Sequence, residues 1–140
     1  MSTEEIQIVI VDDEPYLAEL LGQMLSHFGY RVKTFSTAEA ALEFLAQSPA
    51  ELVITDHFLH DGELSGLDLV RHAWSAWSLP AIVCTACIDE PILTALRAEP
   101  NVRELVRKPF DILQLKDRVG EIIGPPREGG ASAAESSSSP

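Results

Sequence analysis

The stretch IQIVIVDDEP, residues 6–15, indicates the class of fold. Its first six residues are mostly β-branched and form the kind of short apolar run found in buried strands of parallel sheets. Asp12, Asp13 and Glu14 follow, and Pro15 suits the first turn of a helix, whose N-terminus favours acidic side chains. The stretch therefore predicts a central strand that leads directly into a helix.

The rest of the chain repeats this alternation of strand and helix four more times. Strands are predicted at residues 6–11, 31–35, 52–55, 81–85 and 102–106. Helical spacing of apolar residues follows each strand, with the second helix capped by Ser36-Thr37 and the first ended by Gly29. Five such repeats in about 120 residues predict an α/β fold, a doubly wound five-stranded parallel sheet with helices on both faces.

Composition limits the kinds of partner and location. The chain has 140 residues, of which 46% are hydrophobic and 23% charged, as expected for one globular domain. Its 22 acidic against 10 basic residues give a net charge of −12, which disfavours binding to nucleic acid or anionic lipid. No apolar run reaches the roughly 20 residues of a membrane span. Two cysteines and an N-terminus without a basic region lead us to expect a cytoplasmic protein.

A change in composition predicts a domain boundary near residue 123. Residues 124–140 are rich in Gly, Pro and Ser and contain almost nothing apolar larger than Ala. Such a segment buries too little surface to offset the entropy lost on ordering. We therefore expect a folded domain over residues 1–123 and a disordered tail over residues 124–140.

Polar residues capable of phosphate chemistry stand where the predicted strands end. They are Asp12 and Asp13 after the first strand, Asp56 after the third, Thr85 at the end of the fourth and Lys108 after the fifth. Ligands of open parallel sheets bind at this edge. Carboxylates about 4 Å apart repel by about 4 kcal/mol at an effective dielectric constant near 20, so they need cations such as Lys108 and Mg²⁺. The set fits phosphoryl transfer, in which a carboxylate can itself be the nucleophile.

These pieces, in this order, resemble the receiver domain of bacterial two-component response regulators. The resemblance covers about residues 5–123 and implies the flavodoxin-like (βα)5 receiver fold. It is carried by the following segments: Val11-Asp12-Asp13-Glu14-Pro15, Leu52-Val53-Ile54-Thr55-Asp56, Gly66-Leu67-Asp68-Leu69, Thr85-Ala86 and Lys108-Pro109-Phe110.

The resemblance also implies the role of each site residue. Asp56 would accept a phosphoryl group from a histidine kinase or phosphotransfer protein, and Thr85 and Lys108 would contact its oxygens. Asp12, Asp13, Asp56 and the backbone carbonyl of Phe58 would bind Mg²⁺. The Lys108-Pro109 bond would be cis. The domain would then act as a switch and not as a turnover enzyme, signalling by contacts with a downstream protein of unknown identity or by onward phosphotransfer.

Two departures from the family pattern concern the switch itself. After Asp56, Leu59-His60 replace the usual Met-Pro, and Gly66 comes ten residues after Asp56 instead of nine. Leu105 stands three residues before Lys108, where many receivers have Tyr or Phe. We therefore expect a lengthened loop beside the acceptor and a different coupling between phosphorylation and output.

Other interpretations of the same residues remain open at this point. The chain could be a docking module that no longer accepts phosphate, or a hydrolase with an aspartyl-phosphate intermediate resembling the haloacid-dehalogenase-like phosphatases. Those phosphatases carry a D-x-D pattern after the first strand, whereas here the strand ends in Asp12-Asp13-Glu14. Cys84 and Cys87 form a C-x-x-C that, with His57 and His60, would also allow a redox or zinc site.

Overall fold

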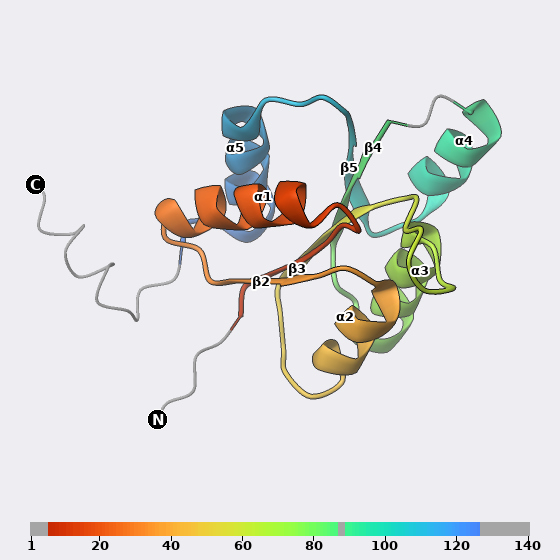
Figure 1. The fold of residues 1–140 in the computed structure, drawn as a ribbon, viewed down its shortest axis with the longest axis horizontal. Helices are drawn as coiled ribbons and strands as arrows, with labels where there is room; N and C mark the ends of the chain where they lie inside the picture. The colour runs from red at the N-terminus through yellow and green to blue at the C-terminus, as the bar shows by residue number, and fades with distance from the viewer. Residues whose placement is uncertain (1–5, 87–88, 127–140) are drawn as a thin grey trace, which may run out of the picture.

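The computed structural model describes residues 6–86 and 89–126. They form five strands alternating with five helices (Figure 1). The strands are β1 (Ile8–Val11), β2 (Val32–Phe35), β3 (Leu52–Asp56), β4 (Ala81–Thr85) and β5 (Val102–Arg107). The helices are α1 (Pro15–His27), α2 (Ala38–Leu45), α3 (Gly66–Trp77), α4 (Glu90–Ala98) and α5 (Ile112–Ile123). The predicted alternation is confirmed throughout.

All strand pairs are parallel, and the strand order is β2-β1-β3-β4-β5. This is the doubly wound order of the flavodoxin-like folds, as predicted. The order reverses between β1 and β3, because the chain first moves outward to β2 and then returns past β1. The ends of β1 and β3 therefore flank the crevice in which such sheets bind ligands.

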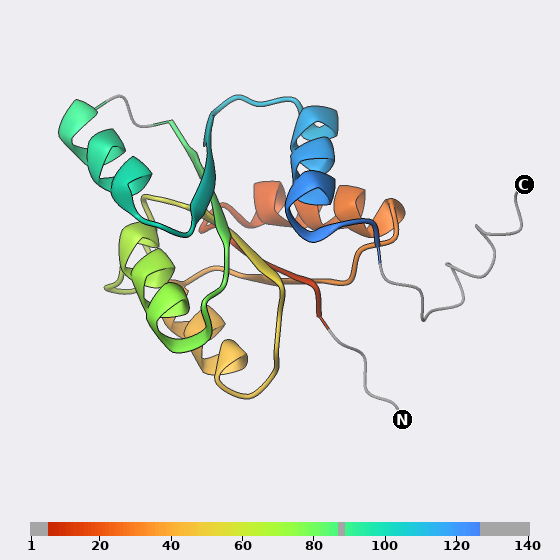
Figure 2. The same cartoon turned by 180° about the vertical axis from the view of Figure 1, so that it is seen from behind.

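Alternation along the strands sorts the core into two layers. In β1, Ile8 and Ile10 pack with residues of α1 and α5, whereas Val9 and Val11 pack with residues of α2 and α3. Leu96 of α4 joins the second side through a smaller cluster. Figures 1 and 2 show the resulting arrangement from opposite directions, with helices on both sides of the central sheet. The buried strand β1 is thus apolar on both faces, as its sequence predicts.

The helix boundaries follow from local chemistry. Pro15 opens α1, and Gly29, with a φ of 106°, lies just beyond its end. The Thr37 hydroxyl accepts a hydrogen bond of 3.1 Å from the Ala40 N–H, which confirms the predicted cap of α2. Ser65 and Asp68 form a reciprocal capping box at the start of α3.

The predicted boundary near residue 123 coincides with the end of α5. Beyond it, the Tyr30 hydroxyl donates a hydrogen bond of 2.9 Å to the Gly124 carbonyl, 94 positions away in the sequence. Residues 127–140, which make up most of the predicted tail, lie outside the described residues. The disorder of that tail stays a prediction.

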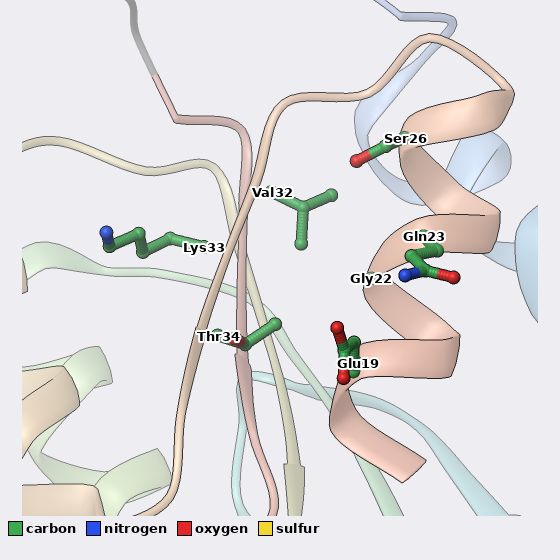
Figure 3. A pocket seen from close by; sticks show the side chains of 7 residues that line it. All are labelled: Glu19, Gly22, Gln23, Ser26, Val32, Lys33 and Thr34. Carbon is green, nitrogen blue, oxygen red and sulfur yellow. The ribbon is translucent and has the colours of Figure 1, made fainter. Parts of the chain in front are cut away.

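A hollow of about 410 Å³ lies between α1 and the edge strand β2 (Figure 3). Val32 and Thr34 point from β2 toward α1, whereas Lys33 points to the other side of the strand. At Gly22 the helix comes so close that an added Cβ would lie 3.1 Å from the Thr34 methyl group. The residues lining this hollow include none of the predicted site residues, so it does not belong to the site.

Candidate functional site

Lys108 joins two of the predicted carboxylates into one ion-paired group. Its Nζ lies 2.7 Å from Asp56 Oδ2 and 3.1 Å from Asp12 Oδ2. The three side chains are only 15%, 12% and 8% exposed, respectively. They come from residues separated by up to 96 positions, and the parallel sheet brings them together because β1 and β3 end at the same edge.

The second oxygen of each carboxylate is held by the backbone. The Glu14 N–H donates to Asp12 Oδ1 at 2.9 Å, and the Phe58 N–H donates to Asp56 Oδ1 at 3.2 Å. The turns that follow β1 and β3 therefore fix the carboxylates, while Lys108 bridges them. Asp56 is thus held by the Phe58 N–H at one oxygen and by the Lys108 ammonium at the other.

Burial and pairing act in opposite directions on the ionisable groups. Burial by itself would lower the pKa of Lys108, but the hydrogen bond and the charge of Asp56, aided by Asp12, raise it above the usual value. Burial, aided by the charge of Asp56, raises the pKa of Asp12 above its usual value although the Glu14 N–H and Lys108 act to lower it. Lys108 therefore remains an ammonium at neutral pH and can neutralise added negative charge.

Asp13 lies at the same edge but has a different partner. Its Oδ2 accepts hydrogen bonds from the His60 backbone N–H and from the His60 ring Nδ1, the latter at 2.9 Å. The Asp13 side chain is 8% exposed, whereas the His60 side chain is 80% exposed. The lengthened loop after β3 thus contacts Asp13 through His60, and it is this loop that supports the Asp13 carboxylate.

Lys108 is itself placed by the strand before it. Its backbone N–H donates to the Thr85 carbonyl at 2.9 Å, which extends the pairing of β5 with β4 beyond the end of the strand. Thr85 is fully buried. The Lys108-Pro109 bond is cis, as predicted.

The loop after β3 ends at Gly66, which lies directly against the backbone of Asp56 and His57. Its N–H donates to the His57 carbonyl at 2.8 Å, and an added Cβ would lie 2.1 Å from the Asp56 carbonyl oxygen. No side chain fits so close to backbone, so only glycine allows α3 to begin directly against the end of β3.

Leu105 takes a structural place in β5. It packs against a cluster of α3, β4 and α4 residues that includes Val70, Val83 and Leu96. A leucine at this position fills an apolar space between the sheet and α4. Leucine carries neither a ring nor a hydroxyl, and the different coupling between phosphorylation and output stays a prediction.

Two features bear on the redox and zinc interpretations. Cys84 is buried, and burial raises the pKa of its thiol to about 12, so the reactive thiolate is disfavoured at neutral pH. Cys87 lies outside the described residues. Across residues 6–86 and 89–126, no group of three or more His, Cys, Asp or Glu side chains is already arranged to hold a metal ion.

The chemistry of the donor set nevertheless fits Mg²⁺. Asp12, Asp13 and Asp56 supply carboxylate oxygens, the hard ligands that Mg²⁺ prefers. Asp12 and Asp56 share the single Lys108 ammonium, so negative charge is in excess at this pair before a divalent cation binds. The residues present would therefore hold this ion, and the backbone carbonyl of Phe58 remains a predicted fourth ligand.

Two residues at the site escaped the sequence-based reasoning. His60 was noted only as a departure from Met-Pro and as a zinc candidate, although it contacts Asp13 directly. Glu39 of α2 gave no signal at all, yet its Oε2 accepts hydrogen bonds from the backbone of the loop after β3. Nothing in the spacing of Glu39 relates it to a loop more than twenty residues away.

A five-stranded parallel sheet with acidic residues and a lysine at one edge defines the receiver class of signalling domains. Residues 8–120 match the response regulator receiver domain family, and the chain belongs to this family. Receiver domains generally bind Mg²⁺ at the phosphorylation site and interact with histidine kinases or phosphotransfer proteins.

Comparison with individual proteins gives the same family and the same fold. The chain is 33% identical to the DNA-binding transcriptional regulator NtrC of Bradyrhizobium over 129 residues, 91% of this chain and 26% of that protein. It is 32% identical to the response regulator ArlR of Staphylococcus aureus, covering 84% of this chain and 52% of ArlR. The chain thus spans about a quarter to a half of these relatives.

Solved receiver structures superpose on most of the chain. A response regulator receiver protein from Pseudomonas putida matches with a TM-score of 0.76 and 25% identity, covering 86% of this chain and 99% of that one. The described residues of the present chain contain no helix long and apolar enough to cross a membrane.

Proposed function

We propose that this receiver domain is a Mg²⁺-dependent phosphoacceptor, with Asp56 as the residue that is phosphorylated. The proposal is carried by the Lys108 ammonium, which lies 2.7 Å from the Asp56 carboxylate in a site that is largely closed to solvent. A positive charge held there stabilises the negative charge that accumulates on a transferred phosphoryl group.

The reaction that these residues support is a displacement at phosphorus. An oxygen of the Asp56 carboxylate forms a bond to phosphorus, and the bond from phosphorus to the donor breaks. The donor is a phosphohistidine of a histidine kinase or phosphotransfer protein, whose nitrogen keeps the electron pair of the broken bond. Lys108 pairs with a phosphoryl oxygen. Thr85 supplies a hydroxyl group from β4, the strand that pairs with β3.

Magnesium bound by Asp12, Asp13, Asp56 and the Phe58 carbonyl would neutralise charge between the carboxylates and the phosphoryl group. The Phe58 N–H and Lys108 both orient the Asp56 carboxylate, one at each oxygen. The nucleophile is thereby positioned before the donor arrives, which lowers the entropic part of the barrier.

The proposed downstream role is that of a phosphorylated switch and not that of an enzyme that turns over a substrate. We infer that the phosphorylated domain signals by contact with another protein or passes the phosphoryl group onward. The cytoplasmic location expected from the sequence stays a prediction, as does the absence of nucleic-acid and membrane partners.

Intact mass spectrometry after incubation with Mg²⁺ and acetyl phosphate tests the proposal. We expect one phosphoryl adduct on the wild-type protein, no adduct without Mg²⁺, and no adduct on Asp56→Asn. Asp61→Asn is the matched control, because Asp61 is an exposed carboxylate in the adjoining loop. If Asp56→Asn takes up phosphate as the wild type does, Asp56 is not the acceptor.

A further inference from the structure

The loop that joins β3 to α3, residues 57–65, is anchored at its far end by α2. Oε2 of Glu39 accepts hydrogen bonds from the Glu63 N–H at 2.8 Å and the Leu64 N–H at 3.1 Å. These backbone bonds, that of Glu63 first, lower the pKa of the exposed Glu39 carboxyl group. These two hydrogen bonds therefore tie the far end of the loop to α2.

Gly62 allows the close approach that this anchor requires. Its φ is 82°, a conformation that favours glycine, and an added Cβ would lie 2.5 Å from Glu39 Oε1. The chain between Asp56 and α3 therefore turns sharply at Gly62, directly before the two N–H groups that Glu39 binds.

At its near end the same loop is bound to Asp13. The His60 backbone N–H and ring Nδ1 both contact Oδ2 of this carboxylate. The His60 ring also stacks on the Phe58 ring, with centroids 6.3 Å apart and planes inclined by 15°. The ring that contacts Asp13 therefore also packs on Phe58.

Each of the three carboxylates at this edge is therefore oriented by its own donors. Lys108 and backbone N–H groups hold Asp12 and Asp56, whereas His60 holds Asp13. Both His60 donors use the same oxygen. A carboxylate has about four lone-pair sites on two oxygens, so the other oxygen of Asp13 keeps its capacity to bind a cation.

We propose that His60 is a positioning residue for the magnesium site, which orients the Asp13 carboxylate and links the lengthened loop to the metal. The proposal rests on the proposed function, since it assumes that Asp13 binds Mg²⁺. Donors that hold a ligating carboxylate typically change metal affinity by about 10- to 100-fold when they are removed. Because the His60 backbone N–H survives any substitution except proline, loss of the ring bond alone is expected at the lower end of this range.

Mg²⁺ affinity measured by NMR titration of backbone amides tests the proposal without any phosphoryl donor. We expect His60→Ala to raise the dissociation constant for Mg²⁺ about 10-fold. His60→Asn is the rescue variant, because the side-chain amide nitrogen of Asn occupies nearly the place of the ring Nδ1 and can donate the same bond. It should bind Mg²⁺ within about two-fold of the wild type, since one donor replaces another.

Three results would overturn the positioning role. They are unchanged affinity in His60→Ala, tighter binding in His60→Ala (which would make the ring a competitor of the metal), and equal weakening in His60→Ala and His60→Asn. An Asp13→Asn variant separates this proposal from the function on which it rests. If the wild type binds no Mg²⁺, or if Asp13→Asn binds it as tightly as the wild type does, the metal site at Asp13 fails, and the role of His60 fails with it. The phosphoryl adduct on Asp56 is measured separately and does not decide either result.

Discussion

The two halves of the acidic edge are held by different kinds of partner. Asp12 and Asp56 share one lysine whose ammonium is largely buried, whereas Asp13 depends on the mostly exposed histidine of a surface loop. A buried ammonium contributes a full charge where water screens it little, while an exposed ring contributes one hydrogen bond. Under the proposed function, the first half would supply the electrostatics of phosphoryl transfer, and the second half would orient one ligand of the proposed metal site.

Removing the shared lysine is expected to have the largest effect. Lys108→Ala leaves the Asp56 phosphoryl group without its ammonium partner, and loss of one such stabilising group typically slows a reaction by about 100-fold or more. The rate of adduct formation with acetyl phosphate, followed by intact mass, measures this.

The control for that variant is Lys33→Ala, which removes an exposed lysine from the edge strand β2. It should phosphorylate at the wild-type rate. If Lys108→Ala stays within about three-fold of the wild type, Lys108 does not supply the electrostatics argued from its contacts.

The pH dependence of the free energy of unfolding is expected to depend on Lys108, which holds Asp12 and Asp56, and not on His60, which holds Asp13. The pKa of Lys108 is raised above 10.5 in the folded state. Its contribution to stability is therefore fully present below about pH 10.5 and is lost as the pH rises through the higher folded pKa. Urea unfolding should show that the wild type loses more stability than Lys108→Ala as the pH rises above about 10.5, since bonds to the charged ammonium, which contribute about 1.5–3 kcal/mol, are lost only in the wild type.

The wild type and Lys108→Ala are compared directly because Tyr30 also contributes to the pH dependence of stability. Burial raises the pKa of its hydroxyl as well, so its contribution falls over the same pH range in both proteins and cancels in the difference. His60→Ala should follow the wild-type curve in this range. Parallel curves for the wild type and Lys108→Ala would contradict the ion-paired geometry.

The smallest effect is expected at Glu39, the α2 residue that binds the loop after β3. Glu39→Ala removes the acceptor of the Glu63 and Leu64 N–H groups, so amide hydrogen exchange at these two positions should become about five-fold faster, as local opening becomes easier. Glu43→Ala, on the same helix and also exposed, should leave exchange there unchanged. Unchanged exchange in Glu39→Ala would show that the loop holds its path without this anchor.

Local sequence patterns were enough to predict the fold. The β-branched run at residues 6–11, the Thr37 cap and Gly29 each act through their immediate neighbours, so they indicate strands and helices without knowledge of the rest of the chain. The positions of Asp56 and Lys108 at strand ends then followed from the rule that parallel strands present their carboxyl ends at one edge.

The loop after β3 was predicted only in part. Its extra length was visible, and so was the replacement of Pro by His60. The partner of that histidine was not, because Asp13 lies 47 positions earlier and is brought near only by the pairing of β1 with β3. Glu39 was missed for the same reason, since α2 meets this loop only in the folded chain.

The sequence by itself determined the alternation of strands and helices, the family, and which residue types stand at the strand ends, because these depend on short-range periodicity and on order along the chain. Only the tertiary structure decided which donor holds which carboxylate oxygen. Those contacts depend on distances between segments far apart in sequence, on how deeply each group is buried, and on the path of a loop that no local pattern specifies.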